Sequence, residues 1–225
     1  MEFATGRWRR LVPWFLVLVL SLALHLWRLE ERSYHHDEAI HAHAAYNLAK
    51  NGNYRYDPTY HGPLLYYLTA ATFVVAGDTD FTARLPIALA GVLLIVIAWT
   101  LRRPLGGRAA WWTAFLVTVS PTFLFYGRFL RMDVLEVLVA SAAVIAAWRA
   151  AHGSSSAWIW VGVWTGLAFA TKENAFVTSA LLGGVTLLMV AGAGIRQSLP
   201  AILRWAHRHR WGLISAAAAM LIVSV

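Results

Sequence analysis

The sequence predicts an all-α, polytopic transmembrane helix bundle of about seven spans, with interfacial helices in its first extracytoplasmic loop. Of the 225 residues, 59% are hydrophobic and only 13% are charged, whereas about a quarter of a soluble domain is charged. Apolar runs of about 17 to 20 residues, the length that crosses a bilayer, recur along the whole chain. Several tryptophans stand at the ends of these runs, where membrane proteins carry an aromatic belt: Trp27, Trp99, Trp111, Trp158 and Trp211.

The first span follows a basic N-terminus. Residues 6–10 carry three arginines, and an apolar run occupies residues 11–27. No small-residue cleavage site follows this run; the charged stretch 28–32 does instead. We therefore expect an uncleaved first helix with its N-terminus in the cytoplasm, rather than a secretory signal peptide.

A polar loop at about residues 29–80 follows the first span and contains two helix-like pieces. The first runs over residues 37–50 and stops at Gly52, a residue suited to end a helix. The second runs over residues 63–76 and is closed by Gly77. At about 14 residues it is too short to cross a bilayer comfortably, so we expect it to be interfacial or re-entrant.

The remaining spans are expected to alternate in direction across the membrane. They are predicted at residues 81–101, 109–126, 134–148, 158–170, 175–190 and 211–225. Their outer loops would be 127–133 and 171–174, and their inner loops 102–108, 149–157 and 194–210. The last ten residues, 216–225, continue as an apolar helix without a cap. We therefore expect residues 1–225 to be the N-terminal part of a longer transmembrane domain, truncated before further helices and any soluble domain.

Charge supports this topology. Ten of the eleven acidic residues fall on the outer side, and Glu2 alone falls inside among the arginines. This matches the positive-inside rule, and treating residues 63–76 as a full span would place the arginines of 102–108 outside. The net charge of +8 thus indicates topology and attraction to anionic membrane lipids rather than nucleic-acid binding. The absence of cysteine excludes disulfides, thiolate metal sites and a cysteine nucleophile.

Two adjacent carboxylates begin the first helix of the outer loop. Asp37 and Glu38 would point about 100° apart on a helix, so they cannot form a close dyad with each other. Asp37 stands where an N-cap is expected, and a capped surface helix is one interpretation. In the other, a carboxylate at the water–lipid boundary acts as a general base, with Glu38 as a supporting ligand or cap.

Four of the nine histidines surround these acids at residues 35–43. Asp37 and His41 are spaced i,i+4, and Glu38 and His41 are spaced i,i+3, so carboxylate and imidazole share a helix face. Such a face suits zinc or manganese, with a further ligand such as His61. A divalent metal is thus a candidate cofactor. The alternative is that the histidines contact water or lipid headgroups, and no HExxH motif occurs.

Charged side chains also stand at the outer ends of the later spans: Arg84, Arg128, Arg131, Asp133, Lys172 and Glu173. Arginine clamps a phosphate with two hydrogen bonds and lysine binds it as a point charge, so the cations suit a lipid-linked phosphate. The alternative is that they extend to headgroups or form local ion pairs, such as Arg131 with Asp133 or Lys172 with Glu173.

After the first helix come His36-Asp37-Glu38, then residues 60–67 (YHGPLLYY), then Arg84-Leu85-Pro86. In order and spacing these motifs resemble the GT-C membrane glycosyltransferases, over roughly residues 5–195. The most similar branch contains protein O-mannosyltransferases and lipid A aminoarabinose transferases, which usually have proline where this chain has Gly62. The chain is also similar to a prokaryotic subgroup sometimes labelled flippase-associated.

The resemblance implies a catalytic aspartate at Asp37, with Glu38 beside it, and a second functional carboxylate at Asp133. It also implies an extracytoplasmic reaction in a prokaryotic plasma membrane. The donor would be a polyprenyl-phosphate-linked sugar, and the acceptor a lipid, glycan or protein. We expect the substrates to be bound by His36, Tyr60, His61, Arg84, Arg128, Arg131, Lys172 and Glu173. The rival hypotheses are a lipid-linked saccharide flippase or its accessory protein, and a scaffold bundle.

Overall fold

The computed structural model describes residues 2–55, 61–185 and 187, and every regular element within that part is helical. The helices are α1 (Glu2–Leu26), α2 (His36–Asn51), α3 (Leu64–Ala76), α4 (Asp80–Thr100), α5 (Arg102–Leu105), α6 (Gly107–Val119), α7 (Pro121–Gly127), α8 (Asp133–Ala151) and α9 (Ala157–Thr171), followed by an apolar helix at Ala175–Val185. The all-α prediction is confirmed for this part of the chain, where no strand occurs.

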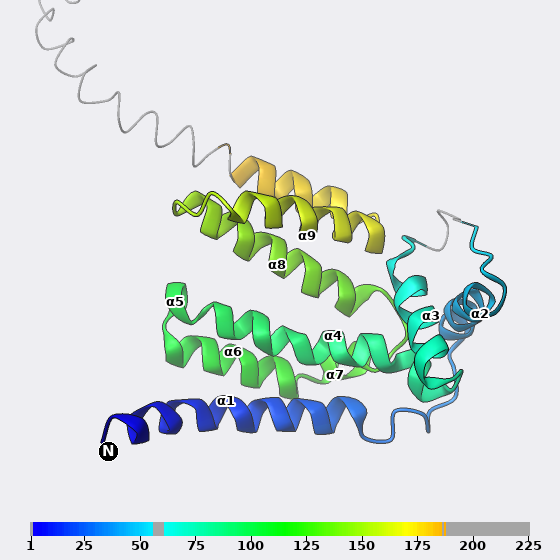
Figure 1. The fold of residues 1–225 in the computed structure, drawn as a ribbon, viewed down its shortest axis with the longest axis horizontal. Helices are drawn as coiled ribbons and strands as arrows, with labels where there is room; N and C mark the ends of the chain where they lie inside the picture. Colours follow the sequence, from blue (N-terminus) through cyan, green and yellow to red (C-terminus); the bar gives the residue numbers. More distant parts are fainter. Residues whose placement is uncertain (1, 56–60, 186, 188–225) are drawn as a thin grey trace, which may run out of the picture. The chain divides into compact units, whose positions relative to one another are not determined.

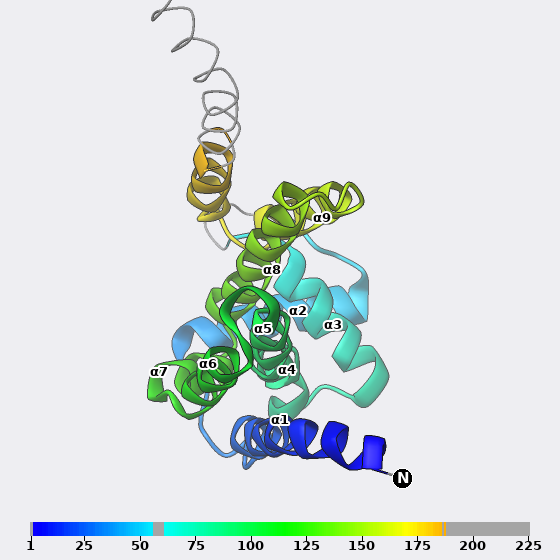
Figure 2. The same cartoon turned by 90° about the vertical axis from the view of Figure 1, so that its left-hand side faces the viewer.

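Within residues 1–179, which form one compact unit, α4 is the central helix. It packs against α1, α3, α6, α7 and α8, and α8 packs against α9. Figure 1 shows α2 and α3 together at the end where α1 finishes and α4 begins, and Figure 2 shows α4 between α1 and α8. The short helix α5, with its two arginines, lies at the opposite end. The described residues between α1 and α4, 27–55 and 61–79, therefore lie at one end of the bundle.

Within the described part of the chain, two helices, α4 with 21 residues and α8 with 19, are long and apolar enough to cross a membrane. The pair α6 and α7 makes a third if it is one bent span. The shorter apolar helices are residues Leu11–Leu26 of α1, then α3, α9 and the helix at Ala175–Val185. The predicted seventh span, at residues 211–225, lies outside the described residues.

The span predicted at residues 109–126 is not one helix. It divides into α6 and α7, which meet at an angle of 62°. Ser120 is extended, with φ −64° and ψ 123°, and Pro121 opens α7. Proline has no backbone N–H to donate and disfavours a helical conformation in the residue before it, so the helix breaks there.

The two ends of α2 show which residues cap it. His35, not Asp37, is the N-cap: its side chain accepts the backbone N–H of Asp37, and the Glu38 carboxylate accepts the backbone N–H of His35. This reciprocal pair is a capping box. Asp37 lies in the first turn instead, where the helix dipole favours a negative charge. At the other end Gly52 has φ 65°, so it ends the helix as predicted.

Small residues let α1, α4 and α7 approach closely. His25 of α1 is buried, and its ring lies against Gly91 of α4 and Gly127 of α7. A Cβ atom at Gly91 or Gly127 would lie 2.5 or 2.7 Å from His25 Nε2. Because lipid tails are as apolar as a protein core, close packing of this kind holds membrane helices together.

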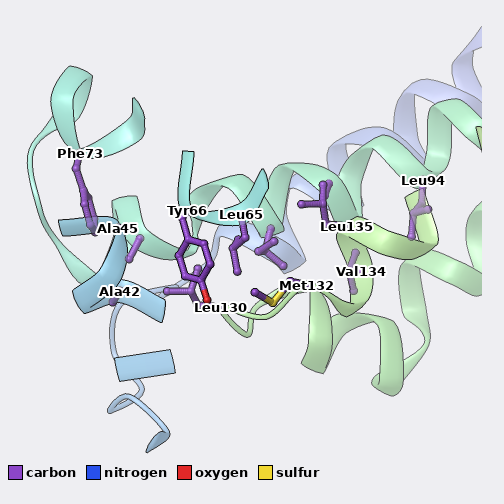
Figure 3. Close-up of a cluster of buried hydrophobic side chains, with 13 residues drawn as sticks. Ala42, Ala45, Leu65, Tyr66, Phe73, Leu94, Leu130, Met132, Val134 and Leu135 are labelled. Carbon is purple, nitrogen blue, oxygen red and sulfur yellow. The ribbon is translucent and has the colours of Figure 1, made fainter. Parts of the chain in front are cut away.

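The largest buried cluster lies beneath α2 and α3. Figure 3 shows Ala42 and Ala45 of α2, Leu65 and Tyr66 of α3, and Leu130 of the segment before α8 among its members. Side chains from α4 complete it. This core fixes the start of α2, the start of α8 and the 128–132 segment relative to one another, and these three pieces carry most of the candidate site.

Candidate functional site

The two adjacent carboxylates have different surroundings. The Glu38 side chain is 0% exposed, whereas the Asp37 side chain is 38% exposed. The two side chains leave α2 about 100° apart, as the sequence predicted, so one points inward and the other outward.

Glu38 forms a buried ion pair with Arg84 of α4. Arg84 Nε lies 3.0 Å from Glu38 Oε1, and Arg84 Nη2 lies 3.3 Å from Glu38 Oε2. The third nitrogen, Nη1, donates to the carbonyl of Leu29 at 2.9 Å, and the guanidinium lies over the Tyr34 ring. Arg84 is itself 0% exposed. Its guanidinium is therefore committed to internal partners, and it does not face a phosphate as the sequence had suggested.

Three more donors converge on the Glu38 carboxylate. They are the backbone N–H of Leu130 at 3.0 Å, the backbone N–H of His35 at 3.1 Å, and Arg32 Nη2 at 2.9 Å. Burial alone would raise the pKa of Glu38, but the bonds from Arg84 and from these backbone groups hold that pKa below its ordinary value. Glu38 is thus an ionised junction between α2, α4 and the 128–132 segment. The geometry supports the capping interpretation, because the carboxylate is closed off from an incoming substrate.

Arg128 is also occupied by the fold. Its Nη1 donates to the carbonyl of Leu24 at 3.1 Å, and its Nη2 donates to the carbonyls of Trp27 and Arg28 at 2.6 and 3.1 Å. These carbonyls lie at and just beyond the end of α1, where a helix leaves backbone oxygens unpaired and a cation is favourable. Arg128 therefore caps the end of α1.

Four other predicted residues meet in one place, which we name the four-charge cluster: Asp37, Arg131, Asp133 and Lys172. Arg131 bridges the two acids, with Nη1 3.6 Å from Asp37 Oδ2 and Nε 3.5 Å from Asp133 Oδ2. Lys172 Nζ donates to Asp133 Oδ1 at 2.8 Å. Asp37 comes from the start of α2, Asp133 from the start of α8 and Lys172 from the residue after α9. Two carboxylates thus alternate with two cations at the end of the bundle that holds α2 and α3.

His41 lies beneath this cluster, one turn after Asp37 on α2. It is buried, and its Nδ1 is 2.9 Å from the hydroxyl of Tyr66. Burial, reinforced by the neighbouring His61, lowers its pKa to about 4, so the ring is neutral at pH 7. In the described residues no group of three or more histidines and acids is placed to hold a metal ion. His41 and His61 therefore have no ligand set there for the candidate metal.

His61 and Glu173 join the start of α3 to the end of α9. His61 Nδ1 lies 2.7 Å from Glu173 Oε2. Of the two local ion pairs offered as an alternative, Arg131 with Asp133 is present, whereas Lys172 pairs with Asp133 rather than with Glu173. Next to His61, Gly62 donates its backbone N–H to the carbonyl of Thr171 at 3.1 Å. A Cβ at Gly62 would lie 2.2 Å from the Ala170 carbonyl oxygen. Proline, the residue usual in the resembling branch, would lose that bond and collide with that oxygen.

The remaining predicted residues lie apart from these contacts. His36 is exposed at the first residue of α2, and Tyr60 lies outside the described residues. Glu136 of α8 and Tyr66 of α3 were not singled out by the sequence reasoning, yet Glu136 is buried one turn after Asp133 and Tyr66 contacts His41. An acid inside the apolar run of residues 134–140 was the available signal for Glu136.

Comparisons with known proteins agree with this architecture. The family model described as dolichyl-phosphate-mannose-protein mannosyltransferase matches residues 60–224. The fold is similar to the crystal structure of ArnT from Cupriavidus metallidurans in the apo state, with a TM-score of 0.65 and 20% sequence identity over 98% of this chain. This chain spans 41% of the length of that one. No curated protein sequence matches the chain.

Proposed function

The chain belongs to the dolichyl-phosphate-mannose-protein mannosyltransferase family of GT-C membrane glycosyltransferases, and we propose that its four-charge cluster transfers a sugar from a polyprenyl-phosphate donor to an acceptor hydroxyl. The predicted membership of the GT-C superfamily is confirmed, and so is an integral membrane fold. The donor class, the outer-side location and the roles of individual residues are our proposal.

The observation that carries the proposal is the alternation of carboxylates and cations at one end of the bundle. Glycosyl transfer from a lipid phosphate needs a base for the acceptor and positive charge for the departing phosphate. Asp133 is bonded to Lys172 at 2.8 Å. Asp37, by contrast, is only loosely paired with Arg131 at 3.6 Å and is 38% exposed, so Asp37 is the carboxylate open to a substrate. Arg131 and Lys172 are the cations. These two requirements concern the acceptor and the phosphate, so the argument does not depend on which sugar is transferred.

In the proposed step, the Asp37 carboxylate takes the proton of the acceptor hydroxyl. The acceptor oxygen forms a bond to the anomeric carbon, and the bond from that carbon to the phosphate oxygen breaks. The electron pair leaves with the polyprenyl phosphate, whose growing negative charge Arg131 and Lys172 stabilise. Asp133, held between both cations, is a positioning residue. Glu38 and Arg84 fix the start of α2, and hence Asp37, from below.

The test uses the full-length protein in nanodiscs with polyprenyl-phosphate mannose and a panel of hydroxyl acceptors. Release of free polyprenyl phosphate, followed by mass spectrometry, reports turnover whichever acceptor is used. Asp37→Asn keeps the shape and removes the base, so the rate should fall about 10²- to 10⁴-fold while the melting temperature stays close to wild type. Asp78→Asn, at a half-exposed acid paired loosely with Lys50, should leave the rate unchanged.

Two outcomes would contradict this assignment. Wild-type turnover in Asp37→Asn would remove Asp37 as the base. Movement of the lipid across the bilayer without sugar transfer would favour the flippase hypothesis instead, because that function needs the cations and no base.

The orientation of the cluster can be tested separately because the chain has no cysteine. We propose that the N-terminus is cytoplasmic and that the cluster faces outward in a prokaryotic plasma membrane. Single variants Glu30→Cys and Ser154→Cys place a thiol at opposite ends of the predicted topology. A membrane-impermeant maleimide added to intact cells should label the first and spare the second. The reverse pattern would overturn the orientation.

A further inference from the structure

Glu136 is a buried acid that the fold leaves without a hydrogen-bond partner. It lies in the first turn of α8 and is 8% exposed. Neither of its carboxylate oxygens has a partner among the described residues. Its neighbours along α8, Val134, Leu135 and Val139, are buried apolar side chains, so the acid does not belong to a surface stripe.

Such a group is costly unless something else binds it. A buried polar group without a partner forfeits the hydrogen bonds that water would give, and a charged group forfeits more. Native proteins leave few groups in this condition, and ionisable residues within membrane helices commonly mark a ligand or ion pathway. Leucine or alanine would fit α8 without that cost. The position therefore calls for donors that the described part of the chain does not supply.

Its place relative to the four-charge cluster indicates where donors come from. Glu136 and Asp133 are three residues apart and so share a face of α8. Lys172 Nζ donates to Asp133 Oδ1 at 2.8 Å. Glu136 thus lies one turn along α8 from the acid that holds Lys172, the cation that would bind the donor phosphate, and it is buried rather than exposed.

We propose that Glu136 accepts a hydrogen bond from a hydroxyl of the donor sugar. The inference rests on the proposed function, because it needs the donor phosphate at Lys172. The phosphate is bonded to the anomeric carbon, so the ring hydroxyls lie close to it and next to Glu136. A hydroxyl supplies the donor that the carboxylate lacks. Glu136 is then the residue that distinguishes a sugar-bearing lipid from the bare polyprenyl phosphate.

The experiment compares the affinities of two lipids for the full-length protein in nanodiscs. The probes are bare polyprenyl phosphate and polyprenyl phosphate carrying mannose, glucose or galactose. We expect wild-type protein to bind one sugar-bearing lipid about tenfold more tightly than the bare lipid, the gain of a hydrogen bond to a charged group. Glu136→Ala should abolish this preference and leave the Kd of the bare lipid unchanged. Glu136→Gln, which keeps one acceptor oxygen, should retain part of it.

The outcomes separate this inference from the function beneath it. If Glu136→Ala or Glu136→Gln weakens both lipids equally, or if both variants keep the full preference, the inference is wrong and the proposed function stands. If Lys172→Met binds bare polyprenyl phosphate as tightly as wild type, the phosphate site is misplaced and both fail. Because glutamine matches glutamate in shape, it also controls for any misfolding of the alanine variant.

Discussion

Asp37 and Glu38 are neighbours in the sequence, yet the fold uses them in opposite ways. Glu38 is sealed inside with five donor contacts, from Arg84 (two), Arg32, Leu130 and His35. The Asp37 side chain is 38% exposed, and its ion pair among the described residues is a loose one, 3.6 Å from Arg131. A carboxylate with all its acceptor positions filled can hold a structure together. A carboxylate with open positions can take a proton from a substrate.

The same contrast holds for the cations. The Arg84 guanidinium donates hydrogen bonds to Glu38 and to the Leu29 carbonyl. The Arg128 guanidinium donates to backbone carbonyls at the end of α1. Among the described residues, the ion pairs of Arg131 and Lys172 are with the carboxylates of the cluster. The buried pair and the four-charge cluster therefore form two layers: one anchors α2 to α4, and the other lies at the surface that the anchor holds in place.

The largest effect is expected from removing the buried Glu38–Arg84 ion pair, which anchors α2 to α4. Glu38→Ala leaves Arg84 buried without its counter-charge, and such changes cost about 3–5 kcal/mol of stability. Asp37→Ala, one residue away but half-exposed, should cost less than about 1 kcal/mol. Thermal unfolding of both variants in the same detergent measures the difference.

A matched surface acid controls for the loss of a charge alone. Glu31 is 49% exposed and pairs with Arg28 in the loop between α1 and α2. The free energy of unfolding of Glu31→Ala should lie within about 0.5 kcal/mol of the wild-type value. Equal melting temperatures for Glu38→Ala and Glu31→Ala would show that the buried pair is not an anchor.

His41 offers a second test, since it lies on the face of Asp37 but in the buried layer. Burial, then the nearby His61 and Arg131, lower its pKa to about 4, while the carboxylates of Asp37 and Asp133 oppose part of that shift. The unfolded chain, with a pKa near 6.5, binds a proton first as the pH falls. Stability from this residue is therefore complete above about pH 6.5 and is lost progressively toward pH 4, by up to about 3 kcal/mol.

The measurement is the melting temperature from pH 7 to pH 4 in wild type and in His41→Gln, whose side chain does not titrate. Wild type should lose more stability over this range than the variant, and the difference isolates His41 from the acids that titrate nearby. Parallel curves would show that the imidazole is accessible to protons in the folded protein.

Sequence reasoning identified all four members of the cluster, because acids and cations at the outer ends of predicted spans must gather at one membrane face. Two local signals were also sufficient. Gly52 ends α2, and the short apolar run at residues 63–76 forms the short helix α3. The break at Ser120-Pro121 was also readable from the proline, although the span was predicted as continuous.

The internal partners could not be predicted in this way. Glu38 and Arg84 are 46 residues apart, and Arg128 reaches back about a hundred residues to the end of α1. Composition and topology place such residues on the correct face, but they do not say whether a side chain turns inward or outward. That choice depends on packing between helices, which is why the internal partners of Arg84 and Arg128 were not predicted.

The smallest expected effect on stability tests the surface layer. Lys172→Met removes a part-buried partner of Asp133 and should change stability by no more than about 1 kcal/mol. Its affinity for polyprenyl phosphate should nevertheless fall about 10- to 100-fold, because a charge-assisted hydrogen bond to the phosphate is lost. Lys50→Met removes the same charge at the far end of α2, where Lys50 lies 3.9 Å from Asp78, and should change neither quantity. A large loss of stability in Lys172→Met with unchanged lipid affinity would show that Lys172 has a structural role. Of Lys172 and Asp37, only Asp37 would then remain as a proposed reactive group.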